Sequence, residues 1–410
     1  MNVSESTLRL PVVEQHRRMP RGARALLSLF EGIDRGGLNV RLPDGEALHF
    51  GSSGEHEATF EVREWPVFDC ILERGDVGLA ETWIDGQWQT ADLASLLTLF
   101  TNNRPAIAKA LYGQWWPLLR ARLRHLLNAN TRSGARRNII AHYDLGNDFY
   151  RLWLDPTMSY SSALFSVAGP RSLASAQLAK YRRVLQRLAA RPGQRVLEIG
   201  CGWGGFAETA AREAGVEVVG LTLSPAQLAY ARERMVVAGV DRQVRIELCD
   251  YRELGAEKFD HLVSIEMIEA VGERWWPTYF ATIARALAPT GRAVVQGITI
   301  RDDLFPRYRR GTDFIQQYIF PGGMLPSRAV FSRLADAAGL AIGDEFAFGR
   351  DYARTLQYWS TSFDENWPAI AALGFDERFR RLWLFYLAYC QAGFDSGSTD
   401  VWQFELAHAR

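Results

Sequence analysis

The fold is decided by Val196-Leu197-Glu198-Ile199-Gly200-Cys201-Gly202-Trp203-Gly204-Gly205. The apolar first half of this stretch is typical of a buried strand, and a helical pattern begins at Phe206, directly after the glycines. Glycines let the backbone turn sharply and let a ligand approach it closely. The N-terminus of the following helix offers free N–H groups and a partial positive charge. The stretch therefore predicts a strand–turn–helix cradle for the polar part of a nucleotide-like ligand.

A carboxylate, Glu198, stands at the end of this strand. In dinucleotide-binding sites that position is normally apolar, and an acidic residue lies about 20 residues further on, at the ribose. After the next apolar run, 216–221, this chain has Thr222 and Gln227 instead of an acid. A carboxylate beside the turn suits a positively charged ligand such as S-adenosylmethionine; a structural turn without a ligand is the alternative. The residues expected to hold the ligand are Glu198, Gly200, Gly202, Gly204, Thr222 and Gln227.

The composition is that of a globular protein long enough for two domains, with 410 residues of which 48% are hydrophobic. Lysine and arginine together number 47, as do aspartate and glutamate, so the net charge gives no reason to expect nucleic acid as a partner. The four cysteines are dispersed, which predicts neither a disulfide framework nor a metal site and is typical of the cytoplasm. No signal peptide and no run of about 18 apolar residues is recognised.

Three segments follow one another along the chain. Residues 1–103 predict a small α+β domain, with a helix over 21–33 and a hairpin that turns at Pro43-Asp44-Gly45. Residues 104–137 predict a basic amphipathic linker rich in tryptophan and arginine. That linker suits either the surface of an anionic bilayer or packing on a neighbouring domain. Residues 138–410 form the third segment and contain the glycine-rich turn.

Strand and helix patterns alternate regularly in the third segment, which predicts a parallel sheet with right-handed crossovers. The ligand is then expected at the carboxyl ends of the strands, near the glycine-rich turn. The last part, 331–409, predicts aromatic-rich helices that close the pocket. The expected strands are 195–199, 216–221, 243–248, 259–265 and 291–299, and the expected helices between and around them are 205–214, 225–238 and 276–287.

Further motifs stand in a distinctive order along the chain. They are Ala141-His142-Tyr143-Asp144-Leu145-Gly146-Asn147-Asp148-Phe149-Tyr150, Leu154-Asp155-Pro156-Thr157-Met158-Ser159-Tyr160-Ser161-Ser162, Gly220-Leu221-Thr222-Leu223-Ser224-Pro225-Ala226-Gln227, Asp250-Tyr251-Arg252, Ile268-Glu269-Ala270-Val271-Gly272, Tyr318-Ile319-Phe320-Pro321-Gly322-Gly323, Asp351-Tyr352-Ala353-Arg354-Thr355-Leu356 and Val401-Trp402-Gln403. Earlier in the chain stand Gly75-Asp76-Val77-Gly78-Leu79-Ala80-Glu81 and Asp85-Gly86-Gln87-Trp88. From about residue 60 to the end, this order and spacing resembles the cyclopropane-fatty-acyl-phospholipid synthase family.

The resemblance implies an α/β fold with a Rossmann-like methyltransferase domain over 138–410. The mostly parallel seven-stranded sheet of this domain is flanked by helices. A smaller α+β domain over 1–103 precedes it in the sequence. It implies S-adenosylmethionine as methyl donor and cis-unsaturated acyl chains of membrane phospholipids as acceptor. It also implies that the first domain serves lipid access and assembly. The implied location is the cytoplasm, with the protein associated peripherally with the inner membrane. Self-association into a homodimer stays open. The implied cofactor contacts extend to Tyr160, Ser161, Asp250 and Tyr251.

The resemblance further implies a catalytic site, in which the family is thought to use a bicarbonate ion as base. Two positions depart from the common pattern, because Ser162 stands for a cysteine and Gln296 for a histidine. Gln296 keeps a hydrogen-bond donor but cannot carry a proton. Ala270 also replaces a common histidine beside Glu269. The implied catalytic residues are Ser162, Glu269, Gln296, Ile298 and Tyr352.

Four functions are compatible with these observations. The first is methylene transfer to the double bond, which forms cyclopropane chains. The second keeps fold and cofactor but yields methyl-branched or methylene-bearing chains, because of Gln296 and Ala270. A catalytically silent lipid-binding protein is the third, and the intact turn with Glu269 speaks against it. A dehydrogenase is the fourth, disfavoured by Glu198 and by the missing ribose acid.

Overall fold

The computed structural model describes residues 19–52, 54, 57–107, 145–165 and 172–409. The chain divides into two compact units. The first comprises Met1–Arg120 and Asp376–Ala392, and the second comprises Ala121–Phe375 and Gly393–Arg410. Most of the predicted linker 104–137, and the start of the motif that contains His142, lie outside the described residues.

The first unit contains a four-stranded sheet in the order β2-β1-β3-β4. Strand β1 (Gly37–Arg41) pairs antiparallel with β2 (Ala47–Gly51), which confirms the predicted hairpin, and parallel with β3 (Glu57–Val62). Strand β3 pairs antiparallel with the short β4 (Trp88–Gln89). The helices of this unit are α1 (Arg21–Phe30), α2 (Pro66–Arg74), α3 (Asp76–Ile84), α4 (Leu93–Asn102) and most of α18 (Glu377–Asp395).

The core of the first unit is aromatic. Phe30 stacks on Phe100 with ring centroids 5.5 Å apart, and Phe60 meets Trp88 edge-on at 5.1 Å. These rings come from α1, α4, β3 and β4, so they join the helices to the sheet. The unit is therefore a small α+β fold with its own core, as its sequence pattern predicts.

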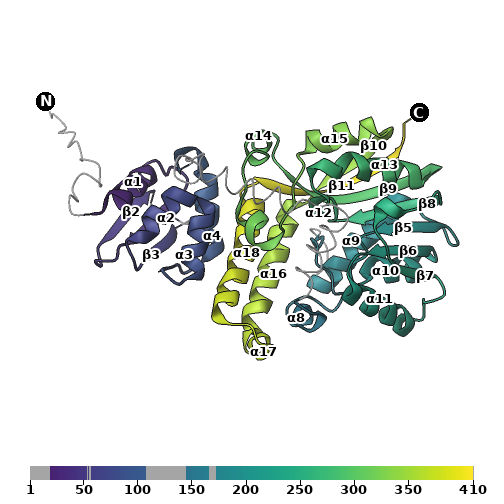
Figure 1. The fold of residues 1–410 in the computed structure, drawn as a ribbon, viewed down its shortest axis with the longest axis horizontal. Coiled ribbons are helices and arrows are strands. Elements are labelled where there is room, and N and C mark those ends of the chain that lie inside the picture. Colours follow the sequence, from purple (N-terminus) through teal and green to yellow (C-terminus); the bar gives the residue numbers. More distant parts are fainter. Residues whose placement is uncertain (1–18, 53, 55–56, 108–144, 166–171, 410) are drawn as a thin grey trace. The chain divides into compact units, whose positions relative to one another are not determined.

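The second unit is built on a seven-stranded sheet in the order β10-β11-β9-β8-β5-β6-β7 (Figure 1). The pairs β5/β6, β5/β8, β6/β7 and β8/β9 are parallel, whereas β11 pairs antiparallel with both β9 and β10. The predicted Rossmann-like fold with a mostly parallel seven-stranded sheet is confirmed. The strands are β5 (Arg195–Ile199), β6 (Glu217–Thr222), β7 (Val244–Leu248), β8 (Phe259–Ile265), β9 (Leu287–Ile300), β10 (Leu340–Ala347) and β11 (Thr399–His408).

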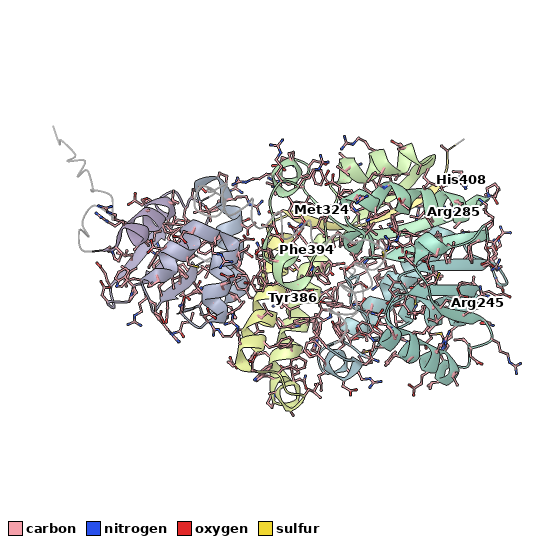
Figure 2. All side chains as sticks on the ribbon, in the orientation of Figure 1. Arg245, Arg285, Met324, Tyr386, Phe394 and His408 are labelled. Carbon is pink, nitrogen blue, oxygen red and sulfur yellow. The ribbon has the colours of Figure 1, made fainter. Side chains whose placement is uncertain are left out.

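Helices cover both faces of this sheet, and side chains fill the space between (Figure 2). The two faces of the sheet have separate hydrophobic cores, as two successive residues of β5 show. Val196 packs in one core with α9, α10 and α11, and Leu197 packs in the other core with α13 and α15. The helices and turns are α8 (Asn147–Arg151), α9 (Leu173–Leu188), α10 (Gly205–Ala214), α11 (Pro225–Ala238), η2 (Tyr251–Glu253), α12 (Ile268–Val271), η3 (Glu273–Trp275), α13 (Trp276–Ala286), α14 (Phe305–Tyr308), η4 (Ile315–Ile319), α15 (Arg328–Ala337), α16 (Gly349–Glu365) and α17 (Trp367–Ala372).

The C-terminal part differs from the prediction of helices alone. It contains the long helices α16 and α18, but also β10 and β11. Strand β11 is inserted between β9 and β10, so a segment late in the chain completes the sheet beside a much earlier strand. Its residues are buried by pairing partners far away in the sequence, which local periodicity does not reveal.

Candidate active site

The predicted cradle is formed by the turn between β5 and α10. The backbone N–H groups of Gly200 and Cys201 both donate to the carbonyl of Leu221, at 3.0 and 2.8 Å, which ties the turn to β6. Gly200, Gly202 and Gly204 have φ of +84°, +52° and +82°, in the left-handed region that favours glycine. A Cβ on Gly204 would lie 2.9 Å from Cε of Met235, so this glycine serves the packing of α10 against α11.

A pocket opens at this turn, at the carboxyl ends of β5, β6 and β8. A Cβ on Gly202 would point into open space, with no atom of the described residues within 4 Å. Gly204 is not among the described residues that line the pocket. The structure thus brings together nine of the ten residues predicted to hold the cofactor: Tyr160, Ser161, Glu198, Gly200, Gly202, Thr222, Gln227, Asp250 and Tyr251.

Glu198 gives the pocket its electrostatic character. Its side chain is buried, with 3% exposed, and its Oε2 has no hydrogen-bond partner among the described residues. Burial raises the pKa of this carboxyl well above its usual range, while Lys180 and Arg234 act in the opposite direction. A buried carboxylate oxygen without a partner is costly unless a ligand satisfies it. A ligand that brings N–H donors and positive charge, as S-adenosylmethionine does, fits this oxygen.

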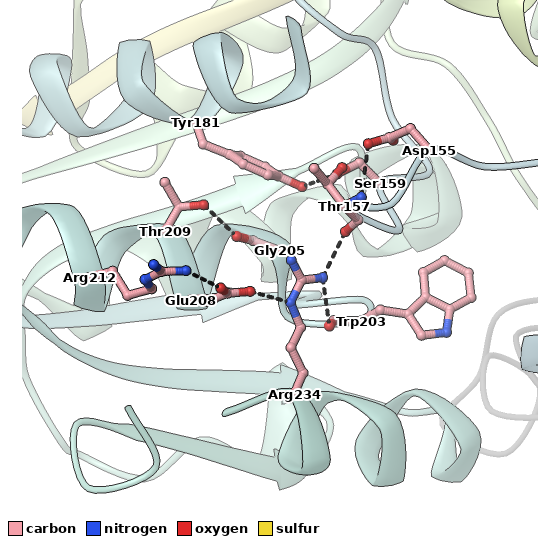
Figure 3. A network of polar contacts seen from close by, with 10 residues as sticks. All are labelled: Asp155, Thr157, Ser159, Tyr181, Trp203, Gly205, Glu208, Thr209, Arg212 and Arg234. Carbon is pink, nitrogen blue, oxygen red and sulfur yellow. Dashed lines mark hydrogen bonds and ion pairs between the residues drawn. The ribbon is translucent and has the colours of Figure 1, made fainter. Parts of the chain in front are cut away.

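The loop before Tyr160 is held against the glycine-rich turn by Arg234 (Figure 3). Its Nη1 donates to the carbonyl of Thr157 at 2.7 Å, and its Nε donates to Oε2 of Glu208 at 2.6 Å. The hydroxyls of Ser159 and Tyr181 lie 2.7 Å apart, so the loop is also tied to α9. These contacts fix the position from which the following residues reach the pocket.

A buried lysine that the sequence analysis did not single out lies below this loop. The Nζ of Lys180 donates to Oγ of Ser161 and to Oε1 of Gln177, both at 2.6 Å. The side chain is fully buried, and burial lowers the pKa of its ammonium group to about 8. Gln177 also donates to the carbonyl of Ser161 at 2.8 Å. Lys180 therefore places a positive charge close to the carboxyl of Glu198.

The other predicted cofactor residues are ordered by their own contacts. Thr222 donates its hydroxyl to Oε1 of Gln227 at 2.9 Å, at the start of α11. The carboxylate of Asp250 accepts from Nε and Nη2 of Arg252, at 2.9 and 2.5 Å. Tyr251, in η2, packs on Tyr279 with ring centroids 5.7 Å apart. These residues form the wall of the pocket beyond β6 and β7.

A second polar cluster surrounds Glu266, which also lines the pocket. Its Oε1 accepts from the backbone N–H of Ser162 at 2.8 Å and from Nε2 of Gln296 at 2.7 Å. Its Oε2 accepts from the hydroxyl of Tyr352 at 2.6 Å. Burial raises the pKa of the Glu266 carboxyl, and the three donors and the charge of Lys180 counteract that rise. The structure therefore brings three of the five predicted catalytic residues to one carboxylate.

The remaining two predicted catalytic residues, Glu269 and Ile298, contact each other. The backbone N–H of Ile298 donates to Oε1 of Glu269 at 2.5 Å, and Oε2 of Glu269 has no partner among the described residues. Burial, and next the neighbouring Glu266, raises the pKa of Glu269 to about 8. The site thus places two buried carboxyl groups with raised pKa side by side: Glu266, which accepts three hydrogen bonds from the described residues, and Glu269, whose pKa of about 8 keeps it a neutral acid at neutral pH.

Glu266 was missed by the sequence analysis, although a signal for it exists. It follows β8 directly, at the edge of the sheet near which Glu198 stands as the second-to-last residue of β5. Charged residues directly after buried parallel strands lie at the ligand-binding edge. Its backbone also has φ of +50°, which is uncommon for a residue with a side chain and frequent at functional sites.

Solved structures with the same fold include mycobacterial enzymes. The mycolic acid cyclopropane synthase CmaA1, complexed with SAH and CTAB, is 33% identical with a TM-score of 0.62, covering 66% of this chain and 97% of that one. The cyclopropane synthase MmaA2 from Mycobacterium tuberculosis is 32% identical with the same TM-score of 0.62, covering 66% of this chain and 98% of that one. Fold and site together define the class: the protein is an S-adenosylmethionine-dependent methyltransferase.

The chain belongs to the mycolic acid cyclopropane synthetase family, whose sequence model matches residues 130–404. The tuberculostearic acid methyltransferase UfaA1 of Mycobacterium tuberculosis (strain ATCC 25618 / H37Rv) is 39% identical over 344 residues, 82% of this chain and 80% of that protein. The cyclopropane-fatty-acyl-phospholipid synthase of Escherichia coli (strain K12) is 36% identical over 354 residues, 86% of this chain and 88% of that protein. These relationships support transfer of a methyl group to lipids.

None of the helices in the described part of the chain is both long and apolar enough to cross a bilayer. Among the same residues, no group of three or more histidine, cysteine, aspartate or glutamate side chains has the arrangement of a metal site.

Proposed function

We propose that this enzyme methylates the cis double bond of unsaturated acyl chains in membrane phospholipids and closes the product to a cyclopropane ring. The observation that carries the proposal is the cluster at Glu266, where Ser162, Gln296 and Tyr352 all donate to one carboxylate at the edge of the cofactor pocket. A base at this place is what ring closure requires, because a proton has to leave the added methyl group.

The cofactor would be held by the residues around the glycine-rich turn. Glu198 offers a buried carboxylate oxygen, and Gly202 leaves space beside it. When bound, S-adenosylmethionine supplies an electrophilic methyl group, whose transfer to a double bond leaves a positive charge on the acyl chain. Aromatic faces can stabilise such a charge without reacting with it. Tyr352 and Trp359 lie beside the site, with ring centroids 6.1 Å apart, and Phe394 stacks on Tyr352 at 4.4 Å.

Glu266 would act as the base in place of a bicarbonate ion. A carboxylate has the planar pair of oxygens that bicarbonate would present, and it already accepts the donors assigned to that ion. Among the described residues, only the hydroxyl of Tyr352 donates to its Oε2, which leaves a lone pair for a proton. The proton leaves the added methyl group for Glu266, and the electron pair of the broken C–H bond joins the neighbouring cationic carbon. The products are a three-membered ring in the acyl chain and a protonated Glu266.

A methylene-bearing chain, reducible to a methyl branch, is the second candidate product. It arises if a hydride moves from the methyl-bearing carbon to its neighbour before the same proton leaves. The sequence feature that motivates this alternative is Gln296, which cannot carry a proton as a histidine could. The 39% identical tuberculostearic acid methyltransferase supports it as well.

The wider setting is proposed on the same family relationship. Residues 1–103 would serve lipid access and assembly, 104–137 would contact the membrane surface, and 138–410 would carry the catalysis. The protein would then work at the cytoplasmic side of the inner membrane, alone or as a homodimer. Vesicle flotation with and without anionic phospholipid tests the membrane contact, since a basic segment binds only the anionic surface appreciably.

The product is tested by expression in a host that lacks its own synthase, fed with methyl-labelled methionine. Mass spectrometry of the membrane fatty acids should show one labelled CH₂ unit added to monounsaturated chains. Resistance of that product to mild hydrogenation supports the cyclopropane. Uptake of hydrogen identifies the methylene product instead, and the absence of labelled lipid contradicts both.

A further inference from the structure

A chain of hydrogen bonds leads from Arg183 on α9 to Glu266 in the pocket. Nη1 of Arg183 donates to Oε1 of Gln403 at 2.7 Å, and Nε2 of Gln403 donates to Oε1 of Gln296 at 3.0 Å. Nε2 of Gln296 then donates to Oε1 of Glu266 at 2.7 Å. Both glutamines are buried, with 0% and 1% exposed, whereas the Arg183 side chain is 18% exposed. A sealed polar path therefore joins the catalytic cluster to an arginine near the surface.

The chemistry of its two ends fixes the direction of this path. The carboxylate of Glu266 only accepts hydrogen bonds, and the guanidinium of Arg183 only donates them. Gln296 must therefore turn its nitrogen toward Glu266, which leaves its oxygen for the amide of Gln403. Gln403 in turn presents its oxygen to Arg183. If either amide were reversed, its oxygen would face another oxygen on one side and its nitrogen would face another nitrogen on the other side.

The backbone supplies the geometry of the path. Gln296 and Gln403 are directly opposite each other in the antiparallel pairing of β9 and β11. Arg183 is held in place by Oδ2 of Asp344 at 3.2 Å and by the ring of Phe346, 4.2 Å from its guanidinium carbon. Because the strand register sets the two amides side by side, the path needs no rearrangement to form.

We propose that Arg183 is a positioning residue for the reaction, which aligns the two amides so that Glu266 keeps its negative charge and remains a competent base. Aligned amides in a buried site polarise one another, so the positive end of the path faces the carboxylate. This inference rests on the proposed role of Glu266, and it adds a residue outside the pocket to the machinery.

Other charged and titratable groups also face Glu266 and set the background for a test. Tyr352 on α16 donates to it, Lys180 on α9 stabilises its charge, and Glu269 on α12 opposes that charge. None of these is altered when the path is cut at Arg183 or at Gln403. A change in the titration of Glu266 in such variants therefore reports the path itself.

The test is a pH titration of Glu266 by NMR, in protein whose glutamate carboxyl groups are labelled with ¹³C. The signal of Glu266 is assigned as the one that disappears in Glu266→Gln. Arg183→Met removes the donor and the charge but keeps the stem beside Phe346. Gln403→Met cuts the path and leaves Arg183 in place. The matched control is Arg182→Met, because Arg182 is on the same helix but pairs with Glu213 at the surface, with 51% of its side chain exposed.

We expect the midpoint of Glu266 to rise by about 0.5–1 pH unit in Arg183→Met and Gln403→Met, and no further in the double variant. The acid limb of the pH profile of kcat/KM should shift upward by the same amount. At pH values below the midpoint, kcat/KM should therefore be about three- to tenfold lower than in the wild type. An unchanged midpoint, or an equal rise in Arg182→Met, overturns the inference. A rise in the midpoint without a shift of the kinetic limb supports the path and contradicts Glu266 as the base.

Discussion

Glu269 offers a quantitative test of the electrostatics of the site, through the variant Glu269→Gln. Burial and the neighbouring Glu266 raise its pKa in the folded protein to about 8, whereas the carboxyl of an unfolded chain titrates near about 4.3. Between these values the unfolded chain has lost the proton that the folded protein still holds. Stability conferred by the neutral acid is therefore complete below the unfolded value and is lost as the pH rises toward 8.

The magnitude follows from the difference of one bound proton. The free energy of unfolding of the wild type should fall by about 1.4 kcal/mol per pH unit from this group alone. Glutamine keeps the shape and has no proton to lose, so the stability of Glu269→Gln relative to wild type should rise by about 3 kcal/mol between pH 5.5 and 7.5. Coupling to Glu266 makes this an upper limit, since the two carboxyls titrate together.

The assay is urea unfolding followed by tryptophan fluorescence at several pH values. Glu233→Gln is the control for the loss of one formal charge, because Glu233 is exposed on α11. Curves for Glu269→Gln and wild type that stay parallel across this pH range would refute a neutral, buried Glu269. The same variant should lose most of its turnover, since the acid contacts Ile298 beside the base.

Three further predictions concern the pocket. Gly202→Val should weaken S-adenosylmethionine binding in calorimetry by at least about tenfold, whereas Gly239→Val, equally strained at φ of +70° but remote from the pocket, should not. Glu198→Gln should also reduce that affinity by about tenfold or more, because a charge-assisted hydrogen bond is lost; unchanged affinity would contradict the role of the buried oxygen. Tyr352→Phe should move the acid limb of the pH–rate profile upward, since a donor to Glu266 at 2.6 Å disappears; an unmoved limb would separate Tyr352 from the base.

Much of the fold could be predicted because its signals are local. The strand 195–199, the helix 205–214 and the strand 259–265 agree residue for residue with β5, α10 and β8. Their apolar runs are short and bounded by glycine or charged residues, so the period and the boundary coincide. In contrast, β11 was not predicted, although apolar and polar residues alternate over 402–406. Its place between β9 and β10 depends on pairing with strands that are distant in the sequence, which no local pattern states.

The site shows the same division between local and long-range information. The cradle residues are close in sequence to the turn, so the chemistry of Glu198 and the glycines could be read directly. The donors around Glu266 come from α16, β9 and the loop before α9, which are far apart in the sequence. A resemblance named those donors but not the carboxylate at their centre. Only the packed structure shows that Glu266 accepts hydrogen bonds from all three of these residues.

Dependence of turnover on bicarbonate shows whether the chain carries its own base, Glu266. Purified enzyme is assayed on vesicles of monounsaturated phospholipid with S-adenosylmethionine, in buffer freed of carbon dioxide and again with added bicarbonate. If Glu266 is the base, turnover of the wild type is equal in both buffers and is almost completely lost in Glu266→Gln. Turnover that requires bicarbonate in the wild type, or that survives in Glu266→Gln without it, would show that Glu266 is not the base.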